Sequence, residues 1–166
     1  MPGSLGILSI NYRPLKTLQI MKALFLTIIL FSGFTTLSLS QTKIADQKVD
    51  SLIKPWIGKP YRYGGTTQAG IDCSGFTQRI LMDLGIIIPR TAKSQYREAT
   101  KVDTCDLQIG DLLFFMSKRS PSGWHVAFYL GNGKFVHAAN RKMGVIVQEL
   151  SADVKRQIYS IGRFTK

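Results

Sequence analysis

The 166-residue chain has few residues of several kinds, and each shortage argues against a class of protein. Two cysteines are too few for a scaffold held together by disulfides. Ten acidic residues stand against 22 basic ones, and the net charge of +12 favours an anionic partner. The basic residues nevertheless occur singly or in pairs, without the run of about five to eight that marks a nucleic-acid patch. No internal repeat is visible, so a solenoid or repeat array is not expected.

Residues 21–40 have the order of a secretory signal peptide. They begin with a short basic segment, continue with the apolar run 23–31, and end on the small residues 38–40, which offer a cleavage site. The apolar run is shorter than the roughly 20 residues that a transmembrane helix needs, although an uncleaved signal anchor remains an alternative. Residues 1–20 precede the signal, and we expect them to be an over-extended gene start. The expected mature domain is therefore 41–166.

Export and charge together indicate where the protein acts. Removal of residues 1–40 takes away three basic residues and no acidic ones, which leaves a net charge of +9. An exported basic protein fits an anionic polymer of the bacterial envelope better than DNA or RNA. We therefore expect a periplasmic or extracellular protein with no nucleic-acid partner. Contact with a membrane is expected only through the signal segment, if it stays uncleaved.

The spacing of apolar residues predicts helices first and strands later. Helical periodicity favours three helices, over 42–53, 74–84 and 91–99. Asp72 can cap the second helix, Gly85 can end it, and Thr91 can cap the third. Five short segments rich in aromatic and β-branched residues predict strands, over 111–116, 124–130, 134–139, 145–150 and 157–164. This order favours an α+β domain whose helices pack on an antiparallel sheet of about five strands.

Cys73 is the main candidate for a nucleophile. It lies between a glycine-rich loop and a predicted helix, in the sequence Asp72-Cys73-Ser74-Gly75. A thiol in the first turn of a helix feels the positive end of that helix, so we expect a lowered pKa and a reactive thiolate. The backbone N–H of Cys73 is a natural donor to an oxyanion. On position alone, an inert buried cysteine remains an open alternative.

The chain has only two histidines, His125 and His137, and both lie in predicted neighbouring strands. With a three-residue loop at 131–133, Ala127 opposes His137, and His125 lies one diagonal away on the same face. A two-residue loop would place the two rings on opposite faces. The order Cys, His, His fits a nucleophile, a base and a residue that orients the base. His125 would then take and return the proton of Cys73, although either histidine alone could be structural.

Other interpretations of these residues are less consistent with the sequence. A zinc site of Cys73 with the two histidines would lack the closely spaced ligand pairs of thiolate sites, and no metal or cofactor is expected. A disulfide between Cys73 and Cys105 would consume the nucleophile. Cys105 lies in a polar connector without a nearby histidine, so we expect it to be free. Neither a phosphate-binding loop nor a Gly-x-Ser-x-Gly motif is present.

Six motifs follow one another within residues 52–164. They are WIGKPYRYGG at 56–65, GIDCSGF at 70–76, IPRT followed by SQ at 88–95, L and GDLLFF at 107–115, HVAFYLGNG at 125–133, and FVHA at 135–138. In this combination the chain resembles the NlpC/p-sixty family of cysteine peptidases, which are cell-wall hydrolases with a papain-like fold. Its compact form, with no added binding domain, looks most like the small murein endopeptidases of that family.

The resemblance implies the same three catalytic residues that the pattern favours, namely Cys73 as nucleophile, His125 as base and His137 as the third member. Tyr61 matches a family tyrosine near the thiol, where it would contact the oxyanion or the substrate. Asp72 and Ser74 match positions that flank the nucleophile and face the free amine of the substrate. Asp72 can serve as the helix cap at the same time. Arg90 is expected to form a structural ion pair, and Asp111 to anchor a turn.

We therefore expect an exported thiol peptidase that hydrolyses amide bonds in the stem peptides of peptidoglycan. The expected bond is D-γ-glutamyl–diamino acid or diamino acid–D-Ala, and the expected partner is peptidoglycan or its muropeptides, bound by a monomer. One alternative is another acyl hydrolase or transferase with the same Cys/His machinery, such as an amidase or a lipid-directed enzyme. A second is a non-catalytic wall-binding module, although intact Cys73, His125 and His137 argue against it.

Overall fold

The computed structural model describes residues 47–165, so the predicted signal peptide at 21–40 lies outside the described residues. Residues 47–53 are helical, which confirms the described part of the first predicted helix. This helix continues into a 3-10 turn, η1 (Lys54–Trp56), whose Trp56 side chain is buried. Within 47–165, no helix is both long enough and apolar enough to cross a membrane.

Two further helices begin at the caps that the sequence predicts. Helix α2 (Cys73–Asp83) starts after Asp72, whose extended backbone turns its carboxylate toward the N–H of Gly75. Helix α3 (Ala92–Glu98) starts after Thr91, whose hydroxyl accepts from the N–H of Ser94. A side-chain oxygen at this position satisfies an N–H that the first turn of a helix leaves without a backbone partner. Gly85, with φ of 81°, follows the end of α2 as expected.

The sheet is antiparallel and has six strands in the order β3-β8-β4-β5-β6-β7. Their bounds are β3 (Thr100–Val102), β4 (Leu112–Met116), β5 (Trp124–Gly131), β6 (Lys134–Asn140), β7 (Gly144–Glu149) and β8 (Ile158–Arg163). The five predicted strands are confirmed, and the sixth, β3, is a three-residue edge strand that sequence periodicity missed. Four short elements complete the described chain: β1 (Thr66–Thr67), β2 (Gly70–Ile71), η2 (Thr104–Asp106) and α4 (Ala152–Gln157).

The loop between β5 and β6 differs from the expected three-residue loop. Gly131 pairs with Lys134, so the turn contains only Asn132 and Gly133. Both turn residues have positive φ, 50° for Asn132 and 67° for Gly133. Two positive φ angles are typical of the type I′ turn, whose twist matches that of the strands it joins. The predicted loop length is therefore wrong.

A bulge in β5 cancels the effect of the shorter turn on the strand register. The register shifts between Tyr129 and Gly131, and beyond the bulge Tyr129 pairs with Phe135. Continued along the strands, this pairing sets Ala127 opposite His137, as predicted. One extra residue on one strand compensates for one residue fewer in the turn, since a slip of one residue exchanges the two faces. The two histidines consequently share a face.

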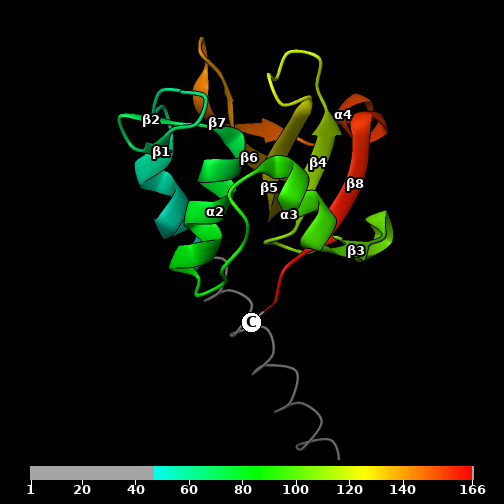
Figure 1. Ribbon diagram of the computed structural model, residues 1–166. Helices are drawn as coiled ribbons and strands as arrows, with labels where there is room; N and C mark the ends of the chain where they lie inside the picture. The colour runs from blue at the N-terminus through cyan, green and yellow to red at the C-terminus, as the bar shows by residue number, and fades with distance from the viewer. Residues whose placement is uncertain (1–46, 166) are drawn as a thin grey trace, which may run out of the picture. The chain divides into compact units, whose positions relative to one another are not determined.

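Helices α2 and α3 cover one face of the sheet (Figure 1). The larger apolar cluster lies between these helices and the sheet, and it includes Phe76 and Ile80 of α2 with Phe114, Val126 and Phe128 of the sheet. Neighbouring strand residues point to the opposite face, where a second cluster lies. That cluster consists of Leu113, Ala127, Phe135, Leu150 and Ile161. Packing in the larger cluster holds α2, and with it Cys73, against β5 and β6.

Candidate active site

Cys73 is the first residue of α2, and only 6% of it is exposed. The backbone N–H groups of Val126 in β5, of Ser74 and of Cys73 itself lie near the thiol and work against the rise in its pKa. The sulfur therefore lies against β5, beside the residue that follows His125 in the chain. Because α2 begins where the chain leaves β2, the cap at Asp72 decides where the sulfur sits.

The two histidines are in contact with each other. The Nε2 atom of His125 lies 2.7 Å from the Nδ1 atom of His137, within hydrogen-bond distance. The two rings cross at 74° with 5.0 Å between their centroids. Phe115 packs near His125, and Phe135 packs edge-on to His137. The two histidines that the sequence places on one face are thus paired, and the Nδ1 atom of His125 is left for another partner.

Burial controls the protonation of all three groups. It raises the pKa of the Cys73 thiol to about 11, and the nearby Asp72 carboxylate adds to this effect despite the N–H donors. Burial also lowers the pKa of His125 to about 4 and that of His137 to about 3. The effect of desolvation on the Cys73 pKa is thus larger than that of the positive end of α2, and the expected lowering of this pKa is wrong. At neutral pH the thiol and both imidazoles are uncharged.

Asp72 forms a bidentate ion pair with Arg90. The Nη1 and Nη2 atoms of Arg90 donate to Oδ1 and Oδ2 at 2.8 Å each, and Nη2 also donates to the carbonyl of Gly65. The N–H of Gly64 and the hydroxyl of Ser74 donate to the same carboxylate. Although burial opposes ionisation, these donors hold the pKa of Asp72 below its usual value. The expected structural role of Arg90 is confirmed, and both carboxylate oxygens are engaged within the protein.

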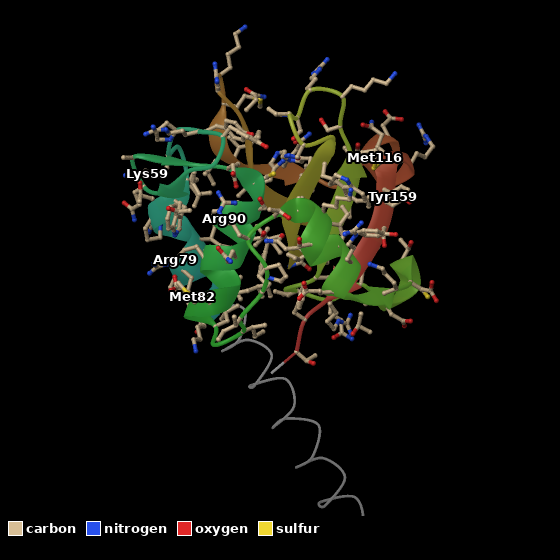
Figure 2. All side chains as sticks on the ribbon, in the orientation of Figure 1. Lys59, Arg79, Met82, Arg90, Met116 and Tyr159 are labelled. Carbon is tan, nitrogen blue, oxygen red and sulfur yellow. The ribbon has the colours of Figure 1, made fainter. Side chains whose placement is uncertain are left out.

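A cleft of about 330 Å³ opens beside Cys73. Its lining contains all of the predicted contact residues and neither histidine, namely Tyr61, Tyr63, Gly64, Asp72, Cys73, Ser74, Arg90, Thr91, Ala92, Ser120 and Ser122. Figure 2 shows Arg90 next to α2. Burial raises the pKa of Tyr61 to about 12, with further contributions from Cys73 and Asp72, so its hydroxyl stays protonated and can donate a hydrogen bond.

Gln95 is a site-supporting residue whose role the sequence did not reveal. Its side chain is fully buried, and its Nε2 atom donates to the carbonyls of Ser74 and Pro89 at 2.9 and 2.8 Å. The hydroxyl of Thr77 donates to its Oε1 atom. One amide thus joins the first turn of α2 to the segment that carries Arg90. Only the position of Gln95 within a motif pointed to it, because its partners are distant in the sequence.

The surroundings of three further residues are also clear. Gly75 leaves no room for a side chain, since a Cβ atom there would lie 2.6 Å from the carbonyl oxygen of Gly65. Asp111 anchors its turn by accepting from the N–H of Gln108, and it also pairs with Arg163. Cys105 is exposed and free. Within residues 47–165, no group of three or more His, Cys, Asp or Glu residues is arranged to hold a metal ion.

Known proteins are similar to this chain in sequence and in fold. The chain is 36% identical over 124 residues to the murein DD-endopeptidase MepS/murein LD-carboxypeptidase of Escherichia coli K12, covering 74% of this chain and 62% of that protein. It is 40% identical over 116 residues to the gamma-D-glutamyl-L-lysine dipeptidyl-peptidase of Bacillus cereus, covering 68% and 35%. The chain therefore spans about three fifths of the first relative and about a third of the second.

A solved structure confirms the predicted fold. The crystal structure of an NlpC/P60 family protein from Bacillus cereus ATCC 10987 matches with a TM-score of 0.64 and 32% identity, covering 73% of this chain and 40% of that one. The model of the NlpC/P60 family matches residues 58–163, which is more than half of the chain. This span contains α2, α3 and all six strands of the sheet. The chain belongs to the NlpC/P60 family.

Proposed function

We propose that this protein is an exported cysteine peptidase that hydrolyses amide bonds in the stem peptides of peptidoglycan. Cys73 is the nucleophile, His125 the general base and His137 the residue that orients the base. The observation that carries the proposal is the 2.7 Å contact between the two histidines, next to the strand residue whose N–H meets the Cys73 thiol. The proposed substrate is supported by the names of the relatives, a murein DD-endopeptidase and a gamma-D-glutamyl-L-lysine dipeptidyl-peptidase.

The first chemical step forms a bond between the sulfur and the substrate's carbonyl carbon. Because the resting thiol is neutral, its proton moves to the Nδ1 atom of His125 as the sulfur attacks. The carbonyl oxygen becomes an oxyanion. The backbone N–H of Cys73 and the hydroxyl of Tyr61 are the donors available to it on the cleft side. His137 stabilises the imidazolium form of His125 through their hydrogen bond.

The second step releases the amine, and the third releases the acid. Protonated His125 gives its proton to the leaving nitrogen as the carbon–nitrogen bond breaks, which leaves a thioester on Cys73. A water molecule then attacks the thioester carbon while His125 takes its proton, and the carbon–sulfur bond breaks. The proton returns to the sulfur, so that the neutral resting site is restored. Every proton in this cycle passes through one nitrogen of His125.

The target bond is D-γ-glutamyl–diamino acid or diamino acid–D-Ala. The charged side chains in the cleft lining are Asp72 and Arg90, and they neutralise each other. Arg90 keeps 32% of its side chain exposed and can still approach a carboxylate of the stem peptide. Asp72 has less capacity for a substrate amine, since both of its oxygens already accept hydrogen bonds. We favour a bond within a longer peptide over one next to a free amino terminus.

Digestion of purified peptidoglycan and of defined muropeptides tests the proposal, with products identified by mass spectrometry. Wild-type protein should generate new amino and carboxyl ends at one of the two bonds. Cys73→Ala should give none, and the matched control Cys105→Ala, at the exposed cysteine, should cleave like the wild type. Binding without cleavage by the wild type would refute the peptidase and favour a wall-binding module. Equal products from Cys73→Ala would refute the nucleophile.

A further inference from the structure

The far nitrogen of His137 has no assigned partner in the mechanism above. Its Nδ1 atom meets His125, whereas its Nε2 atom is buried and makes no hydrogen bond with the described part of the chain. A buried ring nitrogen without a partner is unfavourable, whichever of its two protonation states it adopts. The nitrogen at the end of the Cys–His–His series is therefore the place to look for a further residue.

Gln148 of β7 is the side chain placed to meet that nitrogen. His137 pairs with Ile146, and Phe135 pairs with Gln148, so Gln148 lies one diagonal from His137 on the same face of the sheet. This is the relation on β7 that His125 has to His137 on β5. The Gln148 amide comes near enough to His137 for its hydrogen-bonding effect to work against the lowering of the histidine's pKa by burial. Gln148 is itself exposed, so its side chain is free to adjust.

We propose that Gln148 is a positioning residue that accepts a hydrogen bond from the Nε2–H group of His137 and thereby sets the tautomers of both histidines. With its proton on Nε2, His137 can only accept at Nδ1. His125 must then donate from Nε2, and its Nδ1 atom stays unprotonated. That atom is the one that has to receive the proton of Cys73. Gln148 does not touch the thiol. It acts through His137 and favours the tautomer of His125 that can serve as a base.

The opposite arrangement explains why such a residue matters. If His137 carries its proton on Nδ1, it donates to the Nε2 atom of His125. His125 then has its own proton on Nδ1 and cannot act as a base toward Cys73. The 2.7 Å contact is compatible with both directions, so the contact alone does not choose between them. The Gln148 amide favours the productive direction when its carbonyl oxygen faces the ring, because that oxygen pairs only with a nitrogen that carries a proton, whereas its NH2 group would favour the opposite direction. Gln148 works against the lowering of the His137 pKa, which is the effect expected of an accepting oxygen.

Nitrogen-15 NMR of the full chain tests this inference without reference to activity. The protein has only two histidines, so their four ring nitrogens can be assigned with one His137→Gln variant. In wild-type protein at pH 7 we expect both rings to carry their protons on Nε2. Gln148→Leu should shift part of the population to the Nδ1-protonated forms. Identical tautomers in wild type and Gln148→Leu would overturn the proposal, even if the protein proved not to be a peptidase.

Kinetics on a muropeptide test the consequence, which rests on the proposed function. Gln148→Leu should lower kcat about tenfold, which is the effect expected from losing one hydrogen bond. KM should change little, because Gln148 does not line the cleft. Gln148→Glu, whose carboxylate can only accept, should restore the rate and move the acid limb of the pH profile upward. Glu149→Gln, on the neighbouring exposed position, should match the wild type. Equal losses for Leu and Glu at 148, with an unmoved pH profile, would contradict the inference.

Discussion

The two halves of the site are built in opposite ways. On the helix side, Asp72 and Arg90 are charged and joined by several hydrogen bonds, and Gln95 satisfies both ends of its buried amide. On the strand side, His125 and His137 are uncharged, lie among aromatic rings, and share one hydrogen bond. The helix side fixes positions, whereas the strand side keeps a proton that can move. Catalysis needs both, and each can be disturbed separately.

The largest effect is expected on the strand side. His125→Ala should lower kcat/KM by roughly 10³-fold or more, because no other group accepts the Cys73 proton. The double variant Cys73→Ala/His125→Ala should be no less active than either single variant, since the two residues act as one unit. Steady-state kinetics on a muropeptide measure this, with circular dichroism to check folding. Losses that multiply would indicate that the two residues act independently.

Breaking the ion pair should mainly change stability. Arg90→Ala leaves the Asp72 carboxylate buried without its partner and should lower the free energy of unfolding by about 3 kcal/mol. Arg79→Ala is the matched control, because Arg79 pairs with Asp83 on the exposed side of α2 and should cost about 0.5 kcal/mol or less. Urea denaturation measures both. Similar small losses for the two variants would mean that the buried pair contributes nothing special.

Gln95→Leu should lower the free energy of unfolding by about 2 kcal/mol. The change keeps most of the side-chain volume but leaves the carbonyls of Ser74 and Pro89 without their shared donor. Because the first turn of α2 is then less restrained, kcat should also fall while the pH profile keeps its shape. Urea denaturation and pH-dependent kinetics separate these outcomes. A shift in the pH dependence of kcat would indicate instead that Gln95 affects the proton transfer between Cys73 and His125.

Mild acid should produce the smallest effect, through the histidines. Their pKa values in the folded protein are about 4 and about 3, below the usual 6.5, so the unfolded chain binds more protons as pH falls from 7 to 6. The contribution of the neutral histidines to the free energy of unfolding is therefore fully present above pH 6.5 and decreases toward acid pH. The expected decrease between pH 7 and pH 6 is about 1 kcal/mol. Urea denaturation at the two pH values measures it. Constant stability, or a gain, would contradict neutral buried histidines.

Local rules predicted much of the fold and of the site. The caps at Asp72 and Thr91 were readable because capping depends on neighbours within a few residues. The shared face of His125 and His137 was also predicted, although the two-residue turn and the bulge near Tyr129 that produce it were not. The shorter turn and the bulge shift the register in opposite directions, so their effects cancel. The sequence alone does not indicate this cancellation.

Properties that depend on burial or on distant partners were not predictable in this way. The position of Cys73 at the helix start suggested a low pKa, but its burial against β5 raises the pKa instead. The edge strand β3 is only three residues long, too short for a periodic signal. Gln95 acquires its role from Ser74 and Pro89, which the fold brings to it.

The most direct test of the account is the pH dependence of Cys73 alkylation by iodoacetamide in a Cys105→Ser background, followed by intact-mass spectrometry. A neutral buried thiol should react slowly at pH 7, and its rate should rise only well above pH 9, toward the pKa of about 11. Fast labelling with a midpoint below about pH 6 would show a resting thiolate. That result would contradict a site in which the proton leaves Cys73 only during attack.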